Sequence, residues 1–347
     1  MKHSFKLLTL VWGLFTVSMV SAQETLSEGG FEYKVVADGA EITGGSATGT
    51  LAIPATLGSH PVTSIAAEAF KGAAITELDC SAATGLQRIG ESAFAECSQL
   101  TTVKFPAAET TSLTEIGALA FHHDILLSSM NLQDTRIEVL EALFTKDMYD
   151  EEYLDDLLEL ELPQTLKEIK SYALQFLGLR SITIPSSVTK FGVGVLEGTI
   201  YLEEFYWKGA QVNSLPKNTF LGEDALKTVY FLTVDDIAPN GLSDIHFFMC
   251  HKDKLNVYVT KRSYDILVTN GYDNEKSVYS TLVSDIDYVI GDADGNGFVN
   301  VKDIVEVVNY KLGKPSASFV LKAADVNFDG VVDDTDINLI GSGIVSK

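Results

Sequence analysis

The stretch IGESAFAECSQLTTVKFP, residues 89–106, contains two short apolar patterns that recur along most of this chain. It begins with Ile-Gly and the small-plus-large pair Ala93-Phe94, and it ends with spaced apolar residues before Pro106. Alternating apolar residues predict a short strand with one buried face. Because proline has no amide hydrogen to donate, Pro106 ends the pairing of that strand. The segment therefore predicts a strand, a turn, a second extended piece and a closing apolar pair.

The large residue of the closing pair recurs at intervals of 22 to 30 residues. A second series, in which the strand pattern itself repeats, interleaves with the first. A unit of this length cannot bury its own apolar face, whereas stacked units share one continuous core. We therefore predict a solenoid with a parallel sheet along one side and with these apolar residues in its core. The large residues are Phe70, Phe94, Phe121, Phe144, Leu174, Leu196, Phe220 and Leu242, and the strand patterns cover 100–106, 158–163, 179–185, 202–205 and 226–231.

The pattern of residues 89–106 resembles the BspA-type leucine-rich repeat of bacterial surface proteins, and the resemblance covers roughly residues 45 to 260. It implies an α/β-type repeat solenoid, mainly β, that binds an extracellular protein or glycan through its repeat face. One unit departs from the pattern because residues 145–157 form an insertion with six carboxylates. The insertion is either a cation-binding or recognition loop or a solvated rim segment. Its lack of an ion-binding spacing favours the second interpretation.

Segments at both ends of the repeats have the character of caps. Residues 31–43 alternate and contain turn signals, so they predict a hairpin over the first repeat. Residues 255–259 predict the last strand, and the stretch to Tyr288 closes that end, with Tyr264, Tyr272 and Tyr279 as packing residues. The predicted domains are a capped solenoid over residues 23–285 and a second module over residues 286–347.

Two twelve-residue segments near the end of the chain, 292–303 and 325–336, share one spacing of oxygen-bearing residues. Positions 1, 3, 5 and 9 are Asp or Asn, position 6 is Gly and position 12 is Asp. Calcium takes about six to eight oxygen ligands, and a short loop supplies them by winding around the ion. The spacing predicts two calcium sites, with a backbone carbonyl as the ligand at position 7. The predicted ligands are Asp292, Asp294, Asn296, Phe298, Asn300 and Asp303, and Asp325, Asn327, Asp329, Val331, Asp333 and Asp336.

A helix is expected after each loop, over residues 301–312 and 334–340, and neither loop has an obvious entering helix. In the first helix, Ile304, Val307 and Val308 are expected on one face. Position 8 of each loop is valine (Val299 and Val332), so the two loops can pair through apolar side chains.

The two loop–helix units over residues 291–347 resemble a type I dockerin, a small all-α calcium-binding domain. The resemblance implies a cohesin-like partner and non-covalent attachment to a scaffold or surface protein. It places partner selectivity at loop positions 10 and 11, which are Val301 and Lys302 in one loop and Asp334 and Thr335 in the other. The two pairs differ from each other, which argues against the binding in two orientations that symmetric dockerins allow. A role as a calcium-stabilised cap is the alternative.

Residues 1–22 have the layout of a secretory signal peptide: lysines at the start, an apolar run and small residues before Gln23. The run from Leu7 to Val20 is shorter than the about 20 residues that span a bilayer. We expect an exported bacterial protein, secreted or attached to the cell surface, whose mature chain has no transmembrane segment. The formal net charge of -23 argues against nucleic acid as a partner.

Three cysteines, Cys80, Cys97 and Cys250, cannot all pair within one chain. Buried thiols are the favoured interpretation, and a Cys80–Cys97 disulfide is the alternative.

The leading functional hypothesis is a non-enzymatic binding protein, and two alternatives stay open. One is a component of extracellular polysaccharide breakdown, since dockerins commonly accompany glycoside hydrolases. A hydrolase needs two placed carboxylates in a cleft, but repeats and caps occupy residues 31–288. GxSxG and HExxH motifs are missing, and the adjacent His122 and His123 make a poor metal pair. The other alternative is a purely structural surface protein.

Overall fold

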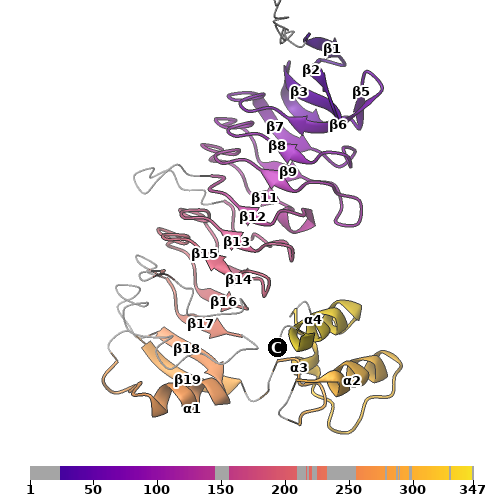
Figure 1. Cartoon of the computed structure of the whole chain (residues 1–347). Coiled ribbons are helices and arrows are strands. Elements are labelled where there is room, and N and C mark those ends of the chain that lie inside the picture. The colour runs from indigo at the N-terminus through magenta and orange to yellow at the C-terminus, as the bar shows by residue number, and fades with distance from the viewer. Residues whose placement is uncertain are drawn as a thin grey trace, which may run out of the picture.

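The computed structural model describes residues 24–144, 156–208, 216, 219–220, 225–232, 255–277, 280–286, 288, 290–296, 299–327 and 330–345. These residues form an elongated stack of coils with a small helical module beside its C-terminal end (Figure 1). None of the helices in this part of the chain has the length and apolarity that a membrane crossing requires. The expected signal peptide, most of the acidic insertion, Leu242, Cys250 and Tyr279 lie outside the described residues.

The N-terminal hairpin cap is confirmed, and it leads into the first sheet of the solenoid. β2 (Phe31–Val36) pairs antiparallel with β3 (Gly39–Gly45), and β1 (Leu26–Glu28) extends the cap. The sheet continues in parallel through the repeats. Its further strands are β6 (His60–Ile65), β8 (Arg88–Ile89) and β10 (Glu115–Ile116), with β5 (Thr56–Leu57) paired to β6.

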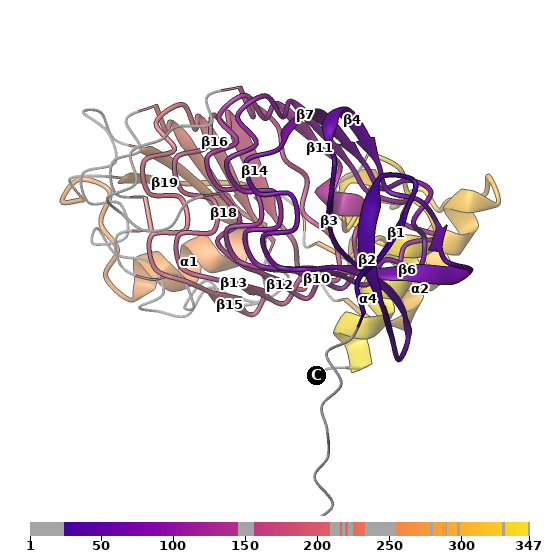
Figure 2. The ribbon, with the colours of Figure 1, turned by 90° about the horizontal axis from the view of Figure 1, so that it is seen from above.

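A second parallel sheet runs along another side of the same repeats, whereas the sequence predicted only one. The N-terminal coils therefore contribute strands to two sheets, because the second extended piece also needs partners for its backbone groups and finds them in the next coil. Figure 2, the view from above, shows successive coils with similar outlines, each displaced sideways from the one before. The second sheet contains β4 (Thr48–Ala52), β7 (Ala74–Asp79), β9 (Thr102–Lys104) and β11 (Ser129–Met130).

The same two-sheet arrangement resumes in the C-terminal half. One sheet contains β12 (Val139–Leu140), β13 (Glu168–Ile169) and β15 (Lys190–Phe191). The other contains β14 (Ser181–Ile184), β16 (Glu204–Trp207), β17 (Thr228–Phe231), β18 (Leu255–Thr260) and β19 (Ser280–Ile286).

Between β11 and β14, residues 157–163 form no strand, and a short 3₁₀ helix, η1 (Leu132–Asp134), lies in the preceding coil. In this unit the prediction that Leu158 is a core residue is wrong. Leu158 is 44% exposed, and its neighbour Leu157 is buried instead. The reason is the repeat spacing: Leu157, Leu160 and Leu162 reproduce the L-x-x-I-x-I pattern of the following unit.

The C-terminal cap of the solenoid differs from its prediction. β18 is followed by helix α1 (Lys261–Thr269) and by one further parallel strand, β19, so residues 255–259 are not the last strand. Thr260 caps α1 by accepting a hydrogen bond from the Ser263 amide at 3.2 Å. Tyr264 and Tyr272 pack against the core, as predicted.

Large apolar side chains fill the space between the sheets. Phe70, Phe94 and Phe121 are buried and stack with ring centroids 5.6 and 5.8 Å apart. Cys80 and Cys97 are buried free thiols, so no disulfide joins them. Burial raises the pKa of Cys97 to about 12, which keeps this thiol protonated and unreactive.

The glycine of each Ile-Gly pair in the repeats lies too close to the backbone of the preceding coil to leave room for a side chain. A Cβ on Gly117 would lie 2.6 Å from the Glu91 backbone nitrogen of the preceding coil. Gly117→Ala should therefore push adjacent coils apart and lower the free energy of unfolding by about 1–3 kcal/mol. Gly85→Ala is the matched control, because its Cβ meets nothing closer than 3.4 Å and the backbone is not left-handed. Denaturant unfolding measures both, and equal effects would contradict the steric account.

Asp124 is a buried carboxyl that makes stability depend on pH. Its Oδ1 accepts a hydrogen bond from the Cys97 amide at 2.8 Å, and burial raises the pKa of Asp124 to about 8. An unfolded aspartate has a pKa near 3.9. Between these values the folded state holds a proton that the unfolded state has released. The free energy of unfolding therefore falls as the pH rises, by at most about 1.4 kcal/mol per pH unit.

Asp124→Asn keeps the acceptor oxygen but cannot ionise, so it should remove this contribution. We expect the stability difference between pH 5 and pH 7.5 to shrink in the variant. Denaturant unfolding of both chains at the two pH values measures it. Parallel pH profiles for the two chains would show that Asp124 does not titrate abnormally.

Candidate metal centre

The C-terminal module consists of two loop–helix units built around one apolar cluster. Helix α2 (Val301–Lys311) follows the first loop, and α4 (Asp334–Val345) follows the second, so α4 is longer than its predicted 334–340. A short helix, α3 (Leu321–Ala324), enters the second loop. It was not predicted, because four residues are too few to show a helical periodicity. The cluster contains Ile290, Ala293, Val307, Ala324, Val326, Val332 and Ile340.

The two position-8 valines lie in this same cluster, Val332 as a buried member and Val299 packed against it. Val307 and Ile304 of α2 also face it. Val308, which was expected on the same face, is instead 39% exposed.

The first loop gathers three carboxylates in one place. One oxygen each from Asp292, Asp294 and Asp303 lies within 4.8 Å of the other two. Asp292 and Asp303 are buried, at 4% and 0% exposure. Three clustered carboxylates repel one another, and burial removes the water that would screen them, so this arrangement favours a bound cation.

Backbone amides wrap the loop around these carboxylates. Asp303 Oδ1 accepts from the Asp294 amide at 3.0 Å, and Oδ2 accepts from the Asn300 amide at 2.8 Å. Asp292 Oδ1 accepts from the Asn296 amide at 3.0 Å. Asn300 caps α2 by accepting from the Lys302 amide at 3.0 Å. The position-12 aspartate, in the first turn of α2, therefore ties the loop to its helix.

The second loop repeats this hydrogen-bonding pattern. Asp336, fully buried, accepts from the Asn327 amide at 3.3 Å through Oδ1 and from the Asp333 amide at 2.8 Å through Oδ2. Asp333 in turn accepts from the Thr335 amide at 2.7 Å. Asp325 Oδ2 accepts from Gly330, whose φ of +82° provides the sharp turn. The two loops therefore share one architecture.

Electrostatics in both loops favour a cation. Burial raises the pKa of Asp303 above its usual range, and the Asp294 carboxylate adds to the shift. Burial also raises the pKa of Asp336, with a further contribution from Asp325. A divalent ion would compensate this negative charge. The donors are hard oxygens, which fit calcium rather than a softer metal.

Ten of the twelve predicted ligands lie among the described residues, and Phe298 and Asp329 lie outside them. Asn296, Asn300, Asn327 and Asp333 lie in the loops at the expected positions, and Val331 is a 57%-exposed residue after Gly330. The number of ions and the complete ligand sets remain predictions.

The repeats match a known family. A model of the BspA type leucine rich repeat region, in six copies, matches residues 56–150 and 152–263. The chain belongs to the BspA-type leucine-rich repeat family. A model of the dockerin type I domain matches residues 290–342, the region of the two loops. Dockerin type I domains are calcium-binding modules, and neither match is to a catalytic domain.

Solved structures with some similarity to this BspA-type chain are bacterial repeat proteins. A leucine-rich repeat protein of T. pallidum is 23% identical and covers 58% of this chain and 91% of its own, with a TM-score of 0.45. A leucine-rich cell surface protein of Faecalibacterium prausnitzii is 15% identical and covers 70% and 84%, with a TM-score of 0.42. A repeat protein of Bacteroides ovatus is 17% identical and covers 74% and 99%, with a TM-score of 0.24. No curated protein matches the chain.

The exposed faces of the two dockerin helices differ chemically, which the sequence analysis did not foresee. Val301, Val305 and Val308 of α2 and its C-cap Leu312 recur every three or four residues and are 39–67% exposed. Such spacing places them along one side of the helix. Among the α4 residues whose exposure the structure describes, the exposed ones are polar: Asp334, Thr335, Asn338 and Ser342.

The predicted selectivity positions are all at the surface. Val301 and Lys302 begin α2, and Asp334 and Thr335 begin α4. Asp334 forms an ion pair with Lys311 of α2. The helix starts are thus apolar and cationic in one unit and acidic in the other.

A polar cavity of about 500 Å³ lies where the repeats meet the dockerin module. Hydroxyl, amide and carboxylate groups of neighbouring coils line it, together with Lys208 and Asn327. This cavity was not predicted, because its walls come from segments far apart in sequence. The polar residues from the coils include Gln133, Glu159, Glu161, Gln164, Ser181 and Thr183.

Proposed function

We propose that this chain is an exported, non-enzymatic binding protein whose dockerin module attaches it, in the presence of calcium, to a cohesin-like partner. The proposal depends most on one observation, the clustered carboxylates of Asp292, Asp294 and Asp303 within a matched dockerin region. Two calcium ions order the loops, and the loops fix the starts of α2 and α4. The chain is thereby held non-covalently at a scaffold or cell surface.

The partner contacts the module through α2 in this proposal. The apolar side of α2 is exposed in the chain, and an exposed row of apolar residues on a soluble domain is typical of an interaction site. Lys302 lies beside Val301 at its start. The acidic start of α4, at Asp334 and Thr335, offers a different surface, so the partner binds in one orientation.

The repeats act as the recognition arm for an extracellular protein or glycan. The polar cavity beside Lys208 supports a ligand rich in hydrogen-bonding groups, because convergent hydroxyl, amide and carboxylate groups are what such ligands require. A role in polysaccharide breakdown and a purely structural role remain the alternative functions.

The test is a calcium-dependent capture experiment with the full mature chain. Immobilised protein is incubated with an extract of the source cell envelope, in calcium and in chelator. We expect one cohesin-like protein to be retained only in calcium, and not by a chain carrying Asp292→Ala and Asp325→Ala. Retention that is equal with and without calcium would refute the attachment mechanism. Hydrolysis products from a glycan panel would refute the non-enzymatic assignment.

A further inference from the structure

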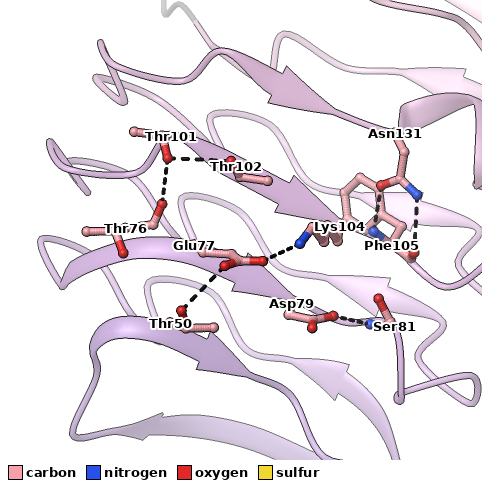
Figure 3. A network of polar contacts seen from close by, with 10 residues as sticks. All are labelled: Thr50, Thr76, Glu77, Asp79, Ser81, Thr101, Thr102, Lys104, Phe105 and Asn131. Carbon is pink, nitrogen blue, oxygen red and sulfur yellow. Dashed lines mark hydrogen bonds and ion pairs between the residues drawn. The ribbon is translucent and has the colours of Figure 1, made fainter.

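One outward-facing position recurs in successive coils, and its chemistry changes along the solenoid. In the N-terminal half the strand register aligns Asp79 with Lys104 at this position. Lys104 forms an ion pair with Glu77 at 2.5 Å. Other polar side chains, among them Thr102 and Asp79, lie around this pair (Figure 3). Thr183 occupies the same position in the C-terminal half, since Lys104 and Thr183 both lie two residues before the proline of their unit.

From Thr183 onwards the position becomes aromatic in three consecutive strands. The parallel register aligns Thr183 with Tyr206, then Tyr230 and then Tyr258. The tyrosine rings stack, with centroids 4.6 and 4.8 Å apart and planes within 18° of parallel. We call Tyr206, Tyr230 and Tyr258 the tyrosine column. Polar side chains are usual on the solvent-exposed face of a sheet. A row of three aromatic side chains there is unusual and indicates that something covers them.

The dockerin module covers the tyrosine column. All three tyrosines pack against the module's apolar cluster, and Leu232, just after β17, is a buried member of that cluster. The module lies beside these last strands in Figure 1. The aromatic residues thus occur in the three strands that pack against the module's apolar cluster.

Lys208 adds a polar contact to this interface. It follows β16, and only 9% of its surface is exposed. Its Nζ donates a hydrogen bond to the main-chain carbonyl of Asn327 in the second calcium loop. A lysine is rarely buried unless its ammonium group has a polar or charged partner. This contact therefore indicates a specific interface between the repeats and the module.

The chain connection favours the same contact. β19 ends at Ile286, and Ile290 is the module's first buried residue in the cluster. A tether this short gives an effective concentration of about millimolar for the contact between the two parts. Even a modest interface is then mostly formed.

We propose that the tyrosine column is an internal docking surface for the dockerin module, and that calcium in the second loop strengthens the docking. Docking makes the repeats and the module one body and leaves the apolar side of α2 open to a partner. The proposed effect of calcium on docking rests on the proposed calcium sites, whereas the docking itself does not. Because Lys208 holds the backbone of the second loop, an ion that orders this loop favours docking, and docking raises the affinity for that ion by the same factor.

The test follows the acylation rate of individual lysines in the full mature chain, read by peptide mass spectrometry. Lys208 is the reporter, and Lys227, whose side chain is 63% exposed, is the internal reference. In saturating calcium we expect Lys208 to react at least about tenfold more slowly than Lys227, because only the undocked fraction exposes it. Tyr230→Thr should bring the two rates together. Lys104→Thr, at the equivalent position, is the matched control and should leave Lys208 protected.

Equal rates for Lys208 and Lys227 in the unaltered chain would overturn the docking proposal. So would full protection of Lys208 in the Tyr230→Thr chain. Transfer to chelator should raise the Lys208 rate by about fivefold or more, and no change would overturn the proposed effect of calcium on docking. If the chain binds no calcium, protection that still depends on Tyr230 would support docking while the calcium proposal fails.

Discussion

We expect calcium to raise the stability of the dockerin module strongly, and Asp292→Ala combined with Asp325→Ala to abolish that rise. An ion that binds only the folded loops stabilises them by about 2.7 kcal/mol per site at a hundredfold excess over its Kd. The two aspartates hold position 1 of their loops, and each accepts a loop amide. Their loss removes a ligand and a turn contact together.

The measurement is calorimetric unfolding of the full chain in calcium and in chelator, with hydrogen exchange of α2 and α4 as a local readout. Glu91→Ala with Glu109→Ala is the control, because it removes the same charge from exposed positions in the repeats. The control should keep the calcium-dependent rise. A rise that persists in the Asp292→Ala, Asp325→Ala chain would show that these loops are not the sites.

Val305→Asp should weaken partner binding more than any other single change on the surface of the module. Val305 lies in the middle of the exposed apolar side of α2 and is 53% exposed, so the substitution leaves the module's core intact. A central apolar contact at an interface typically contributes about 2 kcal/mol or more, which corresponds to about a 30-fold loss of affinity. A buried charge adds to that loss.

Asn338→Asp places the same charge on the exposed side of α4 and is the matched control. Affinity for the captured partner is measured in calcium for both variants, and calcium-dependent stability confirms that both are folded. Similar affinities for Val305→Asp and the unaltered chain would exclude α2 as the binding side. A loss confined to Asn338→Asp would move the site to α4.

The repeats could be predicted from sequence because stacked coils demand the same residue at the same place. Phe94 and Phe121 occupy equivalent positions and stack on each other. The misassignment of Leu158 arose where the unit with the insertion has two adjacent leucines, and only the spacing to Leu160 separates them. β19 was missed because its unit has a helix in place of the usual turn.

The loops were predictable for a similar reason, since ion chemistry fixes the spacing of ligands within twelve residues. Asp303 and Asp336, at position 12, each accept a hydrogen bond from an amide of their own loop. The contact between Lys208 and Asn327 was not predictable, because 119 residues separate them and neither belongs to a local pattern that names the other. The change from polar to aromatic residues at the position of the tyrosine column can be seen in the sequence. That the dockerin module packs there can be seen only in the structure.

Native mass spectrometry of the full mature chain, equilibrated with calcium, tests the attachment account most directly. The account predicts two bound calcium ions per chain, one after Asp292→Ala or Asp325→Ala alone, and none when both are replaced. A chain that carries no calcium under these conditions, with α2 and α4 equally protected from hydrogen exchange in chelator, would contradict it.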